Sequence, residues 1–214
     1  MEKIFTIGDI HGCISKLREL MGRIEIDPQR DTLVFIGDYI DRGPDTKGVV
    51  DFILSLKNRV ANMICLLGNH ERMFLDYLAG RDEELFLSNG GVSTLLSYGL
   101  SPASRGRDVR EKIAEDHLRF FTSLHSYHET DDFIFVHAGL RPGIPLSRQD
   151  PDDMAWIRSD FINSSYDFGK TVVFGHTPLY EVYMDENKIG IDTGAVYGGR
   201  LTCIELPKRK LHQV

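Results

Sequence analysis

The chain has 214 residues, which suits a single domain over residues 1–214, with room for a subdomain insert. Its composition, 42% hydrophobic and 27% charged residues, is that of an ordinary globular protein, and a chain of this length needs no disulfides to fold. The formal net charge of -7 argues against a nucleic-acid or anionic-membrane partner, because phosphate groups are bound mainly by Lys and Arg.

The first third of the chain alternates strand and helix signals. Residues 3–7, 32–36 and 63–67 are short apolar runs that predict buried strands, and residues 13–24 and 49–56 have apolar residues at helical spacing. This β-α-β-α-β order predicts parallel strands joined by crossover helices.

The middle of the chain has a different pattern. Residues 72–79, 91–98 and 109–124 have helical spacing, and Gly-containing turns and a polar loop at residues 101–108 separate them. We expect a helical insert over residues 72–127 that lies over or beside the sheet.

Strand signals return in the second half, at residues 132–137, 171–174, 181–184, 188–192 and 200–206. Glu186-Asn187 predicts a hairpin turn between two of these strands, so we expect this set to be more antiparallel than the first. The basic residues 208–210 are too few to indicate more than a solvated chain end.

Five polar clusters directly follow apolar strands, which is where an α/β sheet presents its ligands. Each cluster begins or ends with Gly and places Asp, Asn or His at a strand end. The clusters are Gly8-Asp9-Ile10-His11-Gly12, Gly37-Asp38-Tyr39-Ile40-Asp41-Arg42-Gly43, Gly68-Asn69-His70-Glu71, His137-Ala138-Gly139 and Gly175-His176-Thr177. One such cluster is ordinarily a plain turn, but turns do not explain five in succession.

Two metal ions best explain this set of carboxylates, amide and imidazoles. Imidazole suits Zn, Fe and Mn, whereas carboxylate and amide oxygens suit harder divalent cations. A pair of metals about 3.5–4 Å apart clamps both the attacking and the leaving oxygen of an in-line displacement, and it acidifies a bound water. The sequence therefore predicts a dinuclear metal site for phosphoester or phosphoanhydride hydrolysis.

In order and rough spacing, the five clusters resemble the signature blocks of the phosphoprotein phosphatase family of calcineurin-like metallophosphoesterases, from residue 4 to about residue 205. The resemblance implies an α/β fold built as a two-sheet β-sandwich flanked by helices. The residues that match the family's metal ligands are Asp9, His11, Asp38, Asn69, His137 and His176, with Asp38 shared by both ions.

The resemblance also implies roles in catalysis and phosphate binding. His70 matches the histidine that protonates the leaving oxygen, and Asp41 matches the aspartate that orients it. Arg42 and Asn69 match positions that face the phosphate. These roles are chemically reasonable, because an alkoxide leaves poorly unless protonated and a guanidinium fits two phosphate oxygens.

Two further residues have weaker signals. Arg158, in Trp156-Ile157-Arg158, resembles a second phosphate-binding arginine of short bacterial members, and the alternative is an exposed loop arginine. Tyr197 lies about where larger relatives carry a loop aromatic that contacts substrate, and a plain Gly-rich turn is the alternative.

By this resemblance we expect a small bacterial type of phosphatase that acts on phosphoserine or phosphothreonine, and on phosphotyrosine if the site is open. A metal-bridging hydroxide would attack phosphorus directly. Two divalent ions are the expected cofactors, manganese in vitro, with iron and zinc as alternatives in the cell. The alternative activity is that of a symmetrical bis(5'-nucleosyl)-tetraphosphatase, which hydrolyses diadenosine tetraphosphate and shares these metal blocks. A non-catalytic phosphate sensor would have lost a ligand or the proton donor, and here every such position is competent.

The expected compartment is the cytoplasm. The N-terminal residues 1–7 lack a basic region and a long apolar core, and no run approaches 18 apolar residues. Cys13, Cys65 and Cys203 are odd in number and widely spaced, which predicts free thiols. We expect a phosphoprotein or phosphopeptide substrate and neither a nucleic-acid nor a membrane partner; the oligomeric state stays open.

Overall fold

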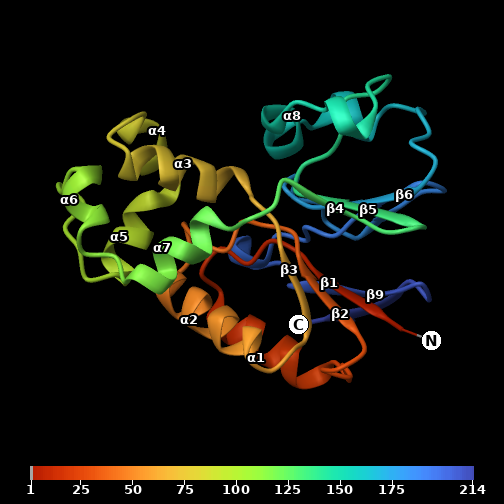
Figure 1. Cartoon of the computed structure of the whole chain (residues 1–214), viewed down its shortest axis with the longest axis horizontal. Coiled ribbons are helices and arrows are strands. Elements are labelled where there is room, and N and C mark those ends of the chain that lie inside the picture. Colours follow the sequence, from red (N-terminus) through yellow and green to blue (C-terminus); the bar gives the residue numbers. More distant parts are fainter. Residues whose placement is uncertain (1) are drawn as a thin grey trace.

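The computed structural model describes residues 2–214, which form two five-stranded sheets that face each other. Helices cover the outer side of each sheet, which gives layers of helix, sheet, sheet and helix (Figure 1). This architecture confirms the expected two-sheet sandwich flanked by helices. Within residues 2–214, every helix is too short or too polar to span a bilayer.

The first sheet contains strands from both the N-terminal and the C-terminal part of the chain. In spatial order its strands are β10 (Lys210–Gln213), β9 (Thr202–Leu206), β1 (Ile4–Ile7), β2 (Thr32–Phe35) and β3 (Asn62–Cys65). The strands β1, β2 and β3 are parallel, as predicted, and β9 is antiparallel to β1. Helices α1 (Ile14–Arg23) and α2 (Thr46–Lys57) are the two crossover helices, and their buried apolar residues belong to the same core as β1 and β2.

Residues 208–210 are exposed, as expected of a solvated chain end, but a strand that the sequence does not predict begins at Lys210. The chain reverses after β9, and β10 continues the antiparallel ladder from Lys210↔Glu205 to Gln213↔Thr202. The edge of a sheet offers unpaired backbone groups, so a short polar segment can form a strand there without an apolar signal in its sequence.

The second sheet has the order β4 (Tyr127–Glu129), β5 (Phe133–Val136), β6 (Thr171–Phe174), β8 (Lys188–Gly190) and β7 (Tyr183–Met184). The turn at Glu186-Asn187 does join two antiparallel strands, β7 and β8. The strands of the second half are more antiparallel than the first three, as expected, because β4–β5, β7–β8 and β9–β1 pair antiparallel. The centre of the second sheet is nevertheless parallel, through β5, β6 and β8. The segment between β5 and β6 makes this possible because it crosses over the outer face with α8 (Pro151–Trp156) and α9 (Ser159–Ile162).

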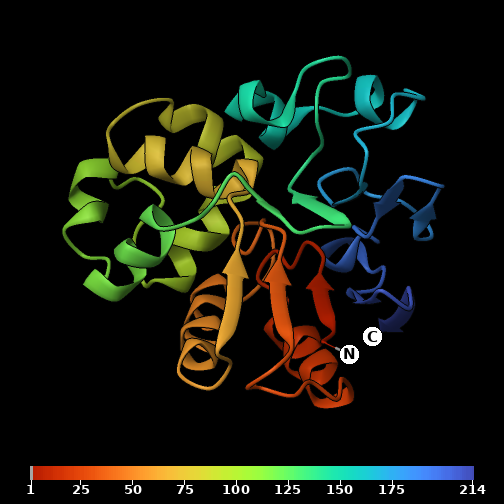
Figure 2. The same cartoon turned by 45° about the vertical axis from the view of Figure 1, so that its right-hand side comes forward.

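The helical insert lies beside the first sheet (Figure 2). Its elements are α3 (Asn69–Leu78), α4 (Glu83–Phe86), a π-helical turn η1 (Leu87–Gly91), α5 (Val92–Ser97), α6 (Gly106–Arg110) and α7 (Glu115–Thr122). The single helix predicted at residues 109–124 is two helices, because the chain bends between them and both insert apolar residues into one core. Helix α6 also begins inside the predicted polar loop. There Gly106 lies against the Tyr77 carbonyl, which leaves no room for a Cβ.

Three apolar clusters hold these layers together. The largest joins the first sheet, α1, α2 and the insert, and the second fills the space between the sheets with Val34, Phe135, Val173, Ile189 and Ile204. The third lies between the second sheet and the α8–α9 crossover. Two short 3-10 helices, η2 (Leu146–Arg148) and η3 (Ala195–Tyr197), complete the fold.

Candidate metal centre and active site

The five polar clusters follow β1, β2, β3, β5 and β6, and side chains from all of them meet at one edge of the sandwich. Seven non-glycine residues within the described range have positive φ, and five belong to these clusters: His11, Asp38, Asp41, Arg42 and His176. A left-handed backbone costs such a residue about 1–3 kcal/mol and persists only where its surroundings hold it. Strain concentrated at one place points to a functional site.

One group of acceptor atoms lies between β3, β5 and β6. The Nε2 atom of His137 is 3.1 Å from Asn69 Oδ1 and 3.4 Å from Asp38 Oδ1, and His176 Nδ1 is 2.9 Å from the same Asn69 oxygen. The Nδ1 atom of His137 lies 2.8 Å from the Ile36 carbonyl oxygen, so we assign the ring proton to Nδ1. The Nε2 lone pair of His137 then faces other acceptors, which is unfavourable unless a cation lies between them.

These separations fit a divalent metal ion. Ligand atoms bonded to one ion at about 2.1 Å lie about 3 Å apart, close to the contacts in this group. Burial lowers the pKa of His137, and burial together with His137 lowers the pKa of His176 to about 2. Both imidazoles are therefore neutral near pH 7, the form that binds metal.

A second group forms around His11. Its Nδ1 lies 2.8 Å from the Ile40 carbonyl oxygen, which leaves Nε2 free to accept. This Nε2 is 3.3 Å from Asp38 Oδ2 and 2.7 Å from Nη1 of Arg42. Because Asp38 presents one oxygen to each group, it occupies the position of a carboxylate that bridges two ions.

Asp9 reaches the site but faces another way. Its carboxylate accepts the backbone N–H of His176, at 3.2 and 3.0 Å. Two sets of His and Asp residues have ligand atoms within 4.8 Å of one another, and Asp9 belongs to neither; the sets in residues 2–214 are His11–Asp38–His70 and Asp38–His137–His176. The assignment of Asp9 as a ligand stays a prediction.

The buried carboxylates of the site repel one another electrostatically. Burial raises the pKa of Asp9 well above its usual value, and the nearby Asp192 and Asp38 raise it further. Burial by itself raises the pKa of Asp38 too, but the imidazoles of His137 and His70 hold it well below the usual value. A cluster of buried acids and neutral imidazoles has an excess of negative charge that divalent cations would neutralise.

His70, the predicted proton donor, is held by Asp41. The Nδ1 atom of His70 is 2.6 Å from Asp41 Oδ2, and both side chains are buried. The backbone N–H of His70 donates to Asp38 Oδ1 at 3.2 Å, and its ring packs edge-on against His11. Its Nε2 is buried and has no hydrogen-bond partner in the described part of the chain. That atom is available to a group that enters the site.

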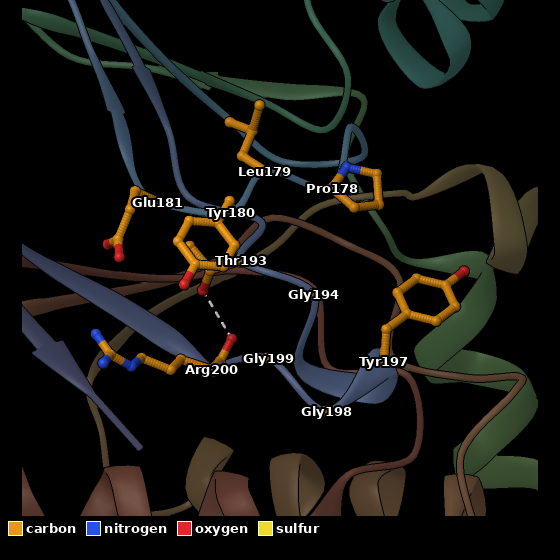
Figure 3. Close-up of a pocket in the computed structure, with 10 residues that line it drawn as sticks. All are labelled: Pro178, Leu179, Tyr180, Glu181, Thr193, Gly194, Tyr197, Gly198, Gly199 and Arg200. Carbon is orange, nitrogen blue, oxygen red and sulfur yellow. Dashed lines mark hydrogen bonds between the residues drawn. The ribbon is translucent and has the colours of Figure 1, made fainter.

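Arg42 lies at the mouth of the site beside Tyr197. The Arg42 guanidinium carbon is 5.6 Å from the centre of the Tyr197 ring, within cation–π distance, and the tyrosine is 63% exposed. A groove of about 540 Å³ adjoins this pair, lined by Pro178, Leu179, Tyr180, Glu181, Thr193, Gly194, Tyr197, Gly198, Gly199 and Arg200 (Figure 3).

Arg158 lies on the opposite crossover, at the start of α9. It is exposed, yet its charge is close enough to His176 to help lower the pKa of that imidazole. The neighbouring Trp156 packs edge-on against the His176 ring at 6.0 Å. The structure thus brings Arg158 to the rim of the site, and its role as a phosphate ligand stays a prediction.

Two residues of the site have no role assigned from sequence. Glu71 is buried and accepts the backbone N–H groups of Asp38, Tyr39, Ile40 and Gly68 at 2.8–3.2 Å. Asp192 is buried near Asp9 and follows β8 in an Asp-Thr-Gly sequence. The strand-end pattern that indicates the five clusters also applies to Asp192. Glu71 stands in the third cluster, but the sequence does not indicate that its side chain binds backbone N–H groups.

Comparison with known proteins agrees with this geometry. The model of the calcineurin-like phosphoesterase family matches residues 2–204. A serine/threonine-protein phosphatase 1 of Salmonella typhimurium is 34% identical over 204 residues, which cover 93% of this chain and 89% of that protein. An asymmetrical bis(5'-nucleosyl)-tetraphosphatase PrpE of Bacillus thuringiensis is 27% identical over 232 residues, covering 96% of this chain and 91% of that protein.

Solved structures show the same architecture. The crystal structure of a candidate diadenosine tetraphosphatase has a TM-score of 0.77 and 25% identity, and the match covers 100% of this chain and 93% of that one. A cold-active protein tyrosine phosphatase has a TM-score of 0.72 at 16% identity, which supports the fold alone. With the family model matching nearly the whole chain and the five clusters assembled around one site, this protein belongs to the phosphoprotein phosphatase family of calcineurin-like metallophosphoesterases.

Proposed function

We propose that this protein is a phosphatase that removes phosphate from phosphoserine and phosphothreonine, and from phosphotyrosine if the active site is open enough to admit it. The observation that carries the proposal is the buried Asp41–His70 pair, whose free Nε2 faces the candidate metal centre. A serine or threonine alkoxide leaves poorly unless a positioned acid protonates it, whereas a phosphoanhydride releases a phosphate that needs less help. The 34% identity to a serine/threonine phosphatase supports the same choice.

Each residue of the site has a role in this reaction. When bound, two divalent ions supply an acidified water and neutralise phosphate charge. His70 donates its Nε2 proton to the leaving oxygen, and Asp41 keeps the ring oriented through Nδ1. Arg42 and Arg158 bind the non-bridging phosphate oxygens from two sides, since Arg42 follows β2 and Arg158 precedes α9. The acceptors that would hold the ions are those of Asp9, His11, Asp38, Asn69, His137 and His176.

A specific observation favours a second activity, hydrolysis of a dinucleoside polyphosphate. The groove beside Arg42 contains two exposed tyrosines, Tyr180 and Tyr197, and aromatic faces of this kind can stack on nucleobases. The Bacillus thuringiensis tetraphosphatase that this chain resembles is asymmetrical, so the products would discriminate between this mode and the symmetrical one expected from sequence. Asymmetrical cleavage of diadenosine tetraphosphate yields ATP and AMP, whereas symmetrical cleavage yields two ADP.

The test is phosphate release from a phosphoserine peptide by the manganese-loaded protein, with diadenosine tetraphosphate measured in parallel. We expect rapid turnover of the peptide, slow cleavage of the dinucleotide, and loss of both activities after chelation or in the Asp38→Asn variant. Rapid cleavage of the dinucleotide with little release from the peptide would replace the proposed function by the second one. Full activity of Asp38→Asn would overturn the assignment of the metal centre.

A further inference from the structure

The helical insert contacts the catalytic residues through Thr94, on α5. The Thr94 hydroxyl donates to Asp41 Oδ1 at 2.6 Å, and its oxygen accepts the backbone N–H of Asp41 at 3.0 Å. Thr94 and Asp41 are both fully buried. The other carboxylate oxygen of Asp41 contacts His70 at 2.6 Å. A continuous chain of hydrogen bonds therefore runs from the insert to the proton donor.

The backbone at this point is strained and needs support. Asp41 and Arg42 are consecutive residues with φ of 70° and 66°, a conformation that non-glycine residues adopt only when neighbouring groups hold them. Thr94 holds the first through its N–H, and the carbonyl oxygen of Gly90 accepts the N–H of Arg42 at 3.2 Å. Only glycine fits at position 90, because its φ is 102° and a Cβ there would lie 2.7 Å from Arg42 Cγ.

Helix α5 is itself hydrogen-bonded to the start of α2. The Ser97 hydroxyl accepts the backbone N–H of Lys47 at 2.9 Å and donates to Asp45, the residue that caps α2. Because α2 packs against the first sheet, α5 has a defined position relative to the loop that follows β2. Thr94 is thus a rigid contact for Asp41.

We propose that Thr94 is the positioning residue of the proton donor, through which the helical insert holds the Asp41 carboxylate in the orientation that aligns His70. A carboxylate can rotate about its Cβ–Cγ bond, and a hydrogen bond to Oδ1 fixes the direction in which Oδ2 meets the imidazole. The inference rests on the proposed function, in which His70 protonates the leaving oxygen. It gives the insert a part in catalysis that is separate from any contact with substrate.

The proposal makes a prediction about leaving groups. A misaligned donor slows release of serine alkoxide, which needs the proton, but not release of p-nitrophenolate, which leaves readily without one. We expect Thr94→Val to lower kcat on a phosphoserine peptide about 10- to 100-fold, to change kcat on p-nitrophenyl phosphate less than about threefold, and to leave KM for both substrates unchanged. Thr94→Ser keeps the hydroxyl and restores most of the peptide activity.

The matched control is Thr6→Val. The Thr6 hydroxyl is also buried, but it has no hydrogen-bond partner within residues 2–214, so this variant should act like the wild type on both substrates. If Thr94→Val does not fold, Thr94→Ala carries the same prediction. An equal loss on both substrates, or no rescue by Thr94→Ser, would make Thr94 a structural residue only and overturn the proposal, as would unchanged peptide turnover in Thr94→Val.

A spectroscopic readout separates this inference from the proposed function. In the protein loaded with Zn²⁺, which is diamagnetic, the His70 Nδ1–H proton resonance reports its hydrogen bond to Asp41. We expect this resonance to shift or broaden in Thr94→Val and to stay in place in Thr94→Ser and Thr6→Val. If the wild type hydrolyses neither phosphate ester, the proposed function fails, and this resonance still decides whether Thr94 positions His70. An unmoved resonance in Thr94→Val would overturn the positioning role.

Discussion

At the scale of single residues, hydrogen bonds to Nδ1 set the orientation of three imidazole rings in the site. Backbone carbonyl oxygens of Ile40 and Ile36 bind Nδ1 of His11 and His137, and Asp41 binds Nδ1 of His70. In each ring Nε2 is consequently left to face the site. Three histidines of the same type thus obtain a fixed orientation, two from backbone carbonyl oxygens and one from the Asp41 carboxylate that was expected to orient it.

Arg158 allows a direct test of phosphate binding at this scale. We expect Arg158→Ala to raise KM about tenfold, which corresponds to about 1.4 kcal/mol of lost binding, and to leave kcat within about threefold, because Arg158 is exposed and lies at the rim. Steady-state kinetics on the phosphoserine peptide measure both constants. Arg148→Ala is the matched control, since Arg148 is also exposed and its side chain has no polar contact in the described range. An unchanged KM in Arg158→Ala would show that Arg158 does not bind the substrate phosphate.

Most of the residues that the structure brings together at the site could be singled out from the sequence, because they lie at strand ends beside Gly. The sequence could not predict Thr94, whose contact with Asp41 depends on how the insert folds back over the loop after β2. Cys13 shows a second limit. Its place at the start of a helix suggests a lowered pKa, but burial raises the pKa of this thiol. Local sequence does not encode burial.

At the scale of elements, Glu71 joins the first turn of α3 to the loop that follows β2. Its two oxygens accept four backbone N–H groups, three of them from residues 38–40 and one from Gly68, the residue that caps α3. These bonds hold Asp38 in its left-handed conformation and set the position of Asn69 and His70 at the helix start. One carboxylate therefore aligns two of the five clusters.

Replacing Glu71 by Gln should disrupt this arrangement. The amide can accept at one end only, and its NH₂ group would face backbone N–H donors that lose their acceptor. We expect the free energy of unfolding to fall by about 2–4 kcal/mol, with loss of turnover. Urea denaturation measures the first effect, and Glu84→Gln, an exposed glutamate on α4, should change stability by less than about 0.5 kcal/mol. Equal stability of the two variants would show that the four contacts contribute little.

The elements predicted from sequence were those with a strong apolar pattern. All eight predicted strands exist, and β6 has the predicted bounds. The structure has two strands that the sequence does not predict, β4 and β10. Both lie at sheet edges and pair with a neighbour that the local sequence does not reveal. The break between α6 and α7 was missed for a related reason, since only the shared core requires the chain to bend there.

At the scale of the whole molecule, the two sheets converge at the edge where the clusters lie. The first sheet supplies the clusters after β1, β2 and β3, and the second supplies those after β5 and β6. The core between the sheets, with Val34 and Ile36 on one side and Phe135 and Val173 on the other, sets their separation. The candidate metal centre therefore joins the two halves of the sandwich, and ions bound there would link the halves directly.

Metal removal should consequently lower global stability. Burial raises the pKa of Asp9, and the negative charges of Asp192 and Asp38 raise it further. The carboxylates therefore repel one another unless cations lie between them. At a concentration of 100 times Kd, one bound ion stabilises the folded state by about 2.7 kcal/mol, which corresponds to about 5–10 °C in Tm for a chain of this size. We expect chelation to lower Tm by at least this amount and Mn²⁺ to restore it. Asp38→Asn, which removes the shared ligand, should show little response to Mn²⁺. A shift of equal size in that variant would mean that the ions bind elsewhere on this acidic protein.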